Sequence, residues 1–106
     1  MTDKKKRVYP LPEVKRLIWK DLIIDPSLNV RQGATDVGLS VYEAHQEILT
    51  LESRHFYKST TEIFNHTVWQ DVYKKEIKGI SVYIKFKICE GKFLLTSFKP
   101  DETEER

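Results

Sequence analysis

From Phe56 onward, apolar and polar residues alternate along the chain with a period of two. The run at 80–88 is unbroken, because Ile, Val, Ile, Phe and Ile alternate there with Ser, Tyr, Lys and Lys. A β-strand places successive side chains on opposite faces, so this alternation gives one apolar and one polar face. The pattern predicts four strands, near residues 56–62, 68–74, 80–88 and 92–99.

The first half of the chain follows a helical period instead. Apolar residues three and four positions apart predict one helix over residues 11–22 and another that starts at Ser40. Ser40 and Glu43 have the spacing of a capping box, which satisfies free amide groups at a helix N-terminus. The predicted buried stripes are Val14, Leu17, Ile18 and Leu22 in the first helix, and Val41, Ala44, Ile48 and Leu51 in the second.

The segment between these two helices shows a weaker pattern. Asp25-Pro26-Ser27 interrupts the chain. Beyond it, we expect a short strand at residues 28–32 and one helical turn at 33–39 that ends at Gly38.

Glu90-Gly91 predicts the turn between the last two strands, and the loop length decides which side chains share a face. A two-residue loop would place Ser97 and Lys99 on the apolar face. A three-residue loop that begins at residue 89 keeps both on the polar face. Since a slip of one residue would bury a lysine, we expect the longer loop. Tyr83 and Lys99 would then lie diagonally across the polar face.

Together these elements predict an α+β fold, in which two to three N-terminal helices pack on one face of a mostly antiparallel sheet. The length of 106 residues fits a single domain, which we place at residues 10–100. Residues 1–9 are expected to form a flexible basic arm, and residues 101–106 an acidic tail.

The composition bears on the cellular location that we expect for this protein. No apolar run approaches the roughly 18 residues of a membrane span. The basic N-terminus is not followed by the long apolar segment of a secretory signal. Cys89 is the single cysteine, which excludes an intrachain disulfide and a zinc cluster built on thiolates. We therefore expect a cytoplasmic protein that contacts no membrane.

Charge is divided unevenly between the two halves of the chain. Residues 8–53 hold four Lys/Arg and seven Asp/Glu, a net charge of −3, whereas residues 54–99 hold nine and four, a net charge of +5. This asymmetry indicates a polyanion or an acidic partner on the second half, although a solvated lysine-rich surface has the same composition. A phosphodiester would suit the predicted polar face, which carries Tyr83, Lys85, Lys87, Ser97 and Lys99.

Four motifs stand in order in the second half: FYKS at 56–59, HTVWQDVY at 66–73, VYIK at 82–85 and SFK at 97–99. The eight-residue block is specific, because it combines two aromatic residues, an amide, a carboxylate and an imidazole in fixed order. Together the motifs resemble the motility quorum-sensing regulator (MqsR) toxin family of bacterial type II toxin–antitoxin modules. The similarity covers about residues 11–99.

This resemblance implies a RelE-like ribonuclease fold and a metal-independent, sequence-selective endoribonuclease that cuts mRNA and so inhibits translation. No cofactor is expected. The residues associated with cleavage in this family match Lys58, Gln70, Tyr83 and Lys99. The resemblance also implies a cognate antitoxin with a zinc-binding part and a helix-turn-helix part, through which the toxin would contact operator DNA indirectly.

Metal-free cleavage of RNA has three chemical requirements. The 2′-hydroxyl must lose a proton, the charge on the pentavalent phosphorus must be neutralised, and the leaving 5′-oxygen must gain a proton. Lysine and tyrosine side chains can meet them. We expect Lys85 and Lys87 to contact the RNA backbone, and His66 to support a turn or strand. His45 and His55 are expected at the surface.

Each of these residues also has an ordinary structural explanation. A lysine on a strand edge deters aggregation, and tyrosines are common in strands. Two other functions therefore stay open. The chain could be a non-catalytic RNA-binding repressor of translation, or a protein-interaction domain whose basic half docks an acidic partner.

Overall fold

The structure, a computed structural model, describes residues 2–102, and in them one five-stranded antiparallel sheet. All four predicted strands are present, and a fifth, very short strand pairs with the first of them at the sheet edge. Residues 103–106 of the predicted tail lie outside the described part. The strands lie side by side in sequence order: β1 (Asp3–Lys4), β2 (Phe56–Thr61), β3 (Trp69–Ile77), β4 (Ile80–Cys89) and β5 (Lys92–Pro100).

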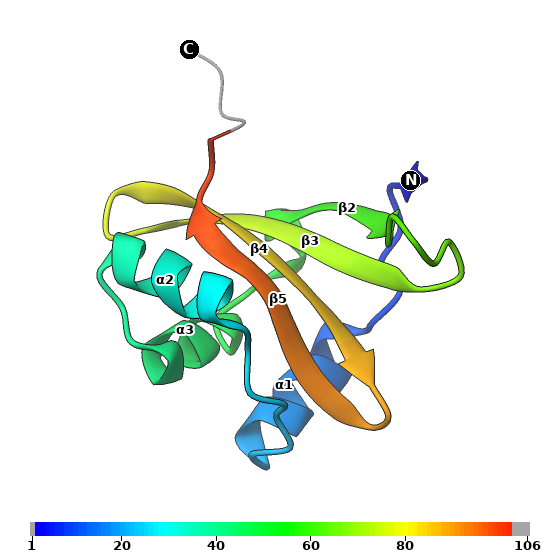
Figure 1. The fold of residues 1–106 in the computed structure, drawn as a ribbon, viewed down its shortest axis with the longest axis horizontal. Helices are drawn as coiled ribbons and strands as arrows, with labels where there is room; N and C mark the ends of the chain where they lie inside the picture. The colour runs from blue at the N-terminus through cyan, green and yellow to red at the C-terminus, as the bar shows by residue number, and fades with distance from the viewer. Residues whose placement is uncertain (1, 103–106) are drawn as a thin grey trace.

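Three helices gather on one side of this sheet (Figure 1). They are α1 (Leu11–Trp19), α2 (Leu28–Val37) and α3 (Val41–Ile48), and a short 3-10 helix, η1 (Ser53–His55), leads into β2. The predicted α+β fold is therefore confirmed. Within residues 2–102, no helix is long and apolar enough to cross a membrane.

Helix α2 stands where we predicted a short strand at residues 28–32, so that prediction was wrong. Ser27 caps the helix, because its Oγ accepts a hydrogen bond from the Val30 amide at 3.4 Å. The helix ends at Gly38, which has a left-handed φ of 90°. The prediction rested on apolar residues at alternating positions, Leu28 and Val30. In the structure Leu28 is 82% exposed and is not on the buried side of the helix.

The two predicted helices are present, with one change of length. Helix α3 begins with a complete capping box between Ser40 and Glu43, as predicted. Helix α1 ends at Trp19 rather than at Leu22, and Asp21 adopts a φ of 60° just beyond it. Leu22 leaves the predicted stripe and accepts a hydrogen bond from the amide of Phe93 in β5 at 2.9 Å.

The hydrophobic core lies between the helices and the face of the sheet that they cover. His45 was expected at the surface, but it is buried in this core. Its ring meets Phe93 edge-on at 5.9 Å, and burial lowers its pKa below the ordinary value. The largest buried side chains of the sheet are Tyr73, Val82, Ile84, Phe86, Phe93, Leu95 and Phe98.

The β4–β5 hairpin turns more tightly than predicted. Glu90 and Gly91 form a two-residue turn with φ values of 52° and 78°, so the expected three-residue loop is wrong. Near this turn, Phe93 and Leu95 therefore point into the core, whereas the expected three-residue loop would have turned them to the polar face.

A β-bulge further along the hairpin supplies the extra residue that we had assigned to the loop. The pairing shifts between Lys85 and the next residue of β4, at the position of Thr96 in β5. Beyond the shift, Lys85 lies opposite Ser97 and Tyr83 opposite Lys99. The bulge thus returns Ser97 and Lys99 to the face away from the helices.

The N-terminal segment, expected to be a flexible arm, lies along the sheet edge. Ser59 of β2 donates a hydrogen bond to the Lys6 carbonyl at 2.9 Å. The carboxylate of Asp71 is completely buried and accepts hydrogen bonds from the amides of Val8 and Tyr9 at 2.8–3.1 Å. A buried carboxylate requires such donors, because an unpaired charge is costly to bury. Asp71 therefore fastens this segment to β3.

Helix α2 approaches β5 most closely at Gly33. A Cβ atom at this position would lie 1.9 Å from the carbonyl oxygen of Phe98, which is far inside van der Waals contact. Only glycine allows the helix to rest directly on the backbone of the strand.

Gly33→Ala should therefore lower the free energy of unfolding by about 2 kcal/mol or more, because helix and strand must separate to admit the methyl group. Urea unfolding followed by circular dichroism measures the change. Asn29→Ala, at an exposed position of the same helix, is the control and should stay within about 0.5 kcal/mol of the parent. Equal stability of the two variants would contradict the close packing.

Candidate functional site

The sheet face opposite the helices, here called the open face, carries the four predicted catalytic residues. Alternation along each strand determines which side chains reach it. The cross-strand pairs that follow place these residues in adjacent rows. The open face consists of Lys58, Gln70, Val72, Lys74, Tyr83, Lys85, Lys87, Ser97 and Lys99.

One row crosses all four long strands. Lys58 in β2 lies opposite Val72 in β3, which lies opposite Lys85 in β4, which lies opposite Ser97 in β5. Neighbouring strands are about 4.8 Å apart, and Lys58 and Lys85 lie two strands apart. Their Cα atoms are therefore separated by about 10 Å. Two extended lysine side chains can reach one ligand across this distance.

The next row brings Lys74, Tyr83 and Lys99 together. Lys74 lies opposite Tyr83, and Tyr83 lies directly opposite Lys99 rather than diagonally across from it. The Lys99 Nζ atom is 5.8 Å from the centre of the Tyr83 ring. A cavity of about 290 Å³ opens here, lined by Tyr83, Lys85, Ser97, Lys99, Asp101 and Glu102.

Lys58 is held by an acidic residue from the N-terminal segment. Its Nζ atom lies 2.8 Å from the Asp3 carboxylate. This hydrogen bond raises the pKa of Lys58 above the ordinary value. Lys58 therefore stays protonated and offers a positive charge at one side of the open face.

Tyr83 keeps its proton for a different reason. Partial burial raises the pKa of its phenol, and the charges of Lys58 and Lys74 oppose that rise. Lys74 is itself paired with the buried Asp101 carboxylate at 3.0 Å. A protonated phenol at this place can donate a hydrogen bond or a proton to a bound anion.

Lys85 has the opposite tendency. It is half-buried in the middle of the open face, and burial lowers its pKa below that of an ordinary lysine. The nearby charges of Lys99 and Lys58 lower the pKa further. Its amine loses a proton more easily than an exposed lysine would.

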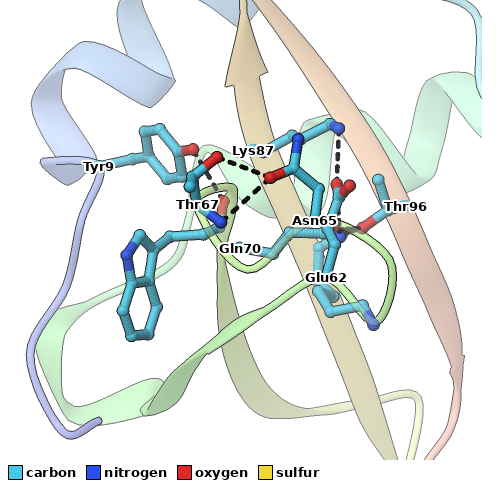
Figure 2. A network of polar contacts seen from close by, with 9 residues as sticks. Tyr9, Glu62, Asn65, Thr67, Gln70, Lys87 and Thr96 are labelled. Carbon is cyan, nitrogen blue, oxygen red and sulfur yellow. Dashed lines mark hydrogen bonds and ion pairs between the residues drawn. The ribbon is translucent and has the colours of Figure 1, made fainter. Parts of the chain in front are cut away.

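Gln70 is bonded at both ends of its amide (Figure 2). Its Nε2 donates to the Glu62 carboxylate at 3.1 Å, and its Oε1 accepts a hydrogen bond from the Thr96 hydroxyl. Lys87 pairs with the same Glu62 carboxylate at 2.6 Å. The amide thus connects the loop after β2 to the bulge in β5, and Lys87 is neutralised beside it.

His66 is not on a strand of the open face. It lies exposed on the loop at residues 62–68, between β2 and β3. In this loop, Asn65 Oδ1 accepts hydrogen bonds from the amide and hydroxyl of Thr67 at 3.1 and 2.6 Å. Asn65 therefore shapes this turn. A supporting role for His66 stays a prediction.

The acidic partners of the open face were missed at the sequence level. Asp3 lies 55 positions from Lys58, and Asp101 lies beyond the last predicted strand, so no local pattern could pair them with lysines. Among residues 2–102, no group of three or more His, Cys, Asp or Glu lies close enough to hold a metal ion. Positive charge on this face comes from lysines.

Comparison with known proteins bears on this arrangement. The family model described as "Motility quorum-sensing regulator, toxin of MqsA" matches residues 6–100. The chain belongs to this toxin family. The mRNA interferase toxin MqsR of Escherichia coli (strain K12) is 36% identical over 67 residues, which cover 63% of this chain and 67% of that protein. The family that the four motifs indicated is thereby confirmed.

The network around Gln70 can be tested through its shared carboxylate. Glu62→Ala should lower the free energy of unfolding by about 1.5–3 kcal/mol, because it leaves Lys87 and the Gln70 amide without their acceptor. Thermal and urea unfolding would measure this. The control is Glu76→Ala, at an exposed position of β3, which should change stability by less than about 0.5 kcal/mol. Equal stability of the two variants would contradict a stabilising role for the Glu62 carboxylate.

Proposed function

We propose that this chain is the toxin of a toxin–antitoxin module and that it cuts mRNA as a sequence-selective endoribonuclease, without a metal ion, thereby stopping translation. The observation that supports this most is the pairing of Tyr83 with Lys99, flanked by Lys58 and Lys85, on one open sheet face. The Escherichia coli relative carries the name mRNA interferase toxin.

The chemistry follows from the protonation of these side chains. The phosphate binds between Lys58 and Lys99, whose charges stabilise the pentavalent transition state. The 2′-hydroxyl gives its proton to a basic group on the open face while its oxygen forms a bond to phosphorus, and the P–O5′ bond breaks. Tyr83, which keeps its proton, donates it to that leaving oxygen. The products are a 2′,3′-cyclic phosphate and a 5′-hydroxyl.

Gln70 takes a positioning role in this proposal. Its amide is occupied by Glu62 and Thr96, so it holds the bulge that aligns Ser97 and Lys99. Lys87, paired with Glu62, lies at the margin of the face, where it contacts the RNA backbone.

The partners follow from the family. An antitoxin binds this toxin and keeps it inactive, and we propose that it is of the type with a zinc-binding part and a helix-turn-helix part. Operator DNA would then be contacted through the antitoxin. The toxin itself would act in the cytoplasm, where its mRNA substrate is translated.

Purified, antitoxin-free protein should cut a long unstructured RNA in the presence of EDTA. Lys58→Ala and Tyr83→Phe should each lower kcat/KM by about 10²–10⁴, because each removes a charge or proton used in the transition state. Gel analysis of fragments and 5′-end labelling would measure both rate and end group. The control variant is Lys92→Ala, at an exposed position near the β4–β5 turn.

Two results would overturn this proposal. Intact RNA with wild-type protein, despite tight binding, would favour a repressor that acts by occupancy. Cleavage that proceeds equally in wild type, Lys58→Ala and Tyr83→Phe would place the active site elsewhere.

A further inference from the structure

Lys85 occupies the centre of the open face. It lies opposite Val72 on one side and Ser97 on the other, and it shares the cavity of about 290 Å³ with Tyr83 and Lys99. Its side chain is half-buried. The path across the sheet from Lys58 to Lys99 runs between this position and Tyr83.

Three other lysines of the open face are paired with carboxylates. They are Lys58, Lys74 and Lys87, which pair with Asp3, Asp101 and Glu62 in that order. Among the ion pairs of residues 2–102, none includes Lys85, although Asp101 and Glu102 line the same cavity. Lys99 also has no such partner there, but it is exposed to solvent.

We propose that Lys85 is the general base that removes the proton from the attacking 2′-hydroxyl, rather than a contact to the RNA backbone. This inference rests on the proposed ribonuclease function and adds a catalytic residue to it. The neutral Nζ atom takes the 2′-hydroxyl proton while the 2′-oxygen bonds to phosphorus. The P–O5′ bond breaks, and its electron pair and the Tyr83 proton go to the 5′-oxygen. Water then returns a proton from the Lys85 ammonium to the Tyr83 phenolate.

The charged groups around Lys85 support this role. Lys58 from β2 and Lys99 from β5 act on it with positive charge, and Glu62 is the acidic group of the adjoining loop. Asp101 and Glu102 line the same cavity but form no ion pair with Lys85. Burial and the charges of Lys99 and Lys58 outweigh Glu62 and lower the pKa of Lys85. Neutral amine is therefore present at lower pH than for an ordinary lysine. Lys58 has the opposite shift, which suits a permanent cation.

Lys85→Arg separates the two roles of this residue. Arginine keeps the positive charge and the reach to phosphate but does not give up its proton. On a short RNA that contains the mapped cleavage site, the variant should lose at least about 100-fold in kcat with KM changed less than about threefold. Lys92→Arg is the matched control and should keep both constants. In the pH profile of kcat/KM, the wild-type rise with increasing pH through the Lys85 pKa should disappear in the variant.

A modified substrate then distinguishes a base from an acid. RNA with a bridging 5′-sulfur has a leaving group that needs no proton. On this substrate, the defect of Lys85→Arg should persist, whereas the defect of Tyr83→Phe should shrink. Binding of an uncleavable RNA with a 2′-deoxy residue at the cleavage site shows that each variant is folded. If Lys85→Arg does not fold, Lys85→Gln is tested in the same way.

The inference is overturned if folded Lys85→Arg cleaves ordinary RNA within about threefold of wild type, or if its defect vanishes with the sulfur leaving group. Both outcomes leave the ribonuclease function intact. Absence of cleavage by the wild-type protein would instead reject the proposed function itself.

Discussion

The register of the β4–β5 hairpin is the constraint on which the open face depends. Side chains alternate along a strand, so a shift of one residue in β5 would turn Lys99 toward the helices. The bulge at Thr96 prevents this, and the Thr96 hydroxyl contacts both the Gln70 amide oxygen and the Lys85 carbonyl, the latter at 3.1 Å. A single extra residue in β5 therefore decides whether Tyr83 and Lys99 meet.

Electrostatics explains how several lysines can share this face. Like charges repel, and the cost falls when each acquires an acidic partner. Those partners come from separate parts of the chain: β1, the loop after β2, and the residue after β5. Acidic partners thus lower the repulsion among the lysines of the face, while Lys99 keeps a charge that no carboxylate of residues 2–102 pairs with. The N-terminal segment, which Asp71 holds in place, becomes part of the site through Asp3.

The sequence predicted the features that depend on neighbouring residues, namely the faces of the strands and the start of a helix. Strand alternation placed Tyr83, Lys85 and Lys99 on one face, and the Ser40 capping box marked the start of α3 correctly. It could not locate the bulge, because an extra residue anywhere between the turn and Ser97 would preserve the same alternation. The pairing of Lys58 with Asp3 depends on a chain path that brings distant segments together. Burial of His45 likewise depends on Phe93 from β5.

A crystal structure with an RNA whose cleavage-site residue is 2′-deoxy would test the arrangement most directly. The oxygens of the scissile phosphate should lie within about 3.2 Å of the Lys58 Nζ and Tyr83 hydroxyl atoms. The sugar C2′ should face Lys85. A phosphate bound instead beside Lys5, Lys6 and Arg7, with the open face empty, would contradict the account.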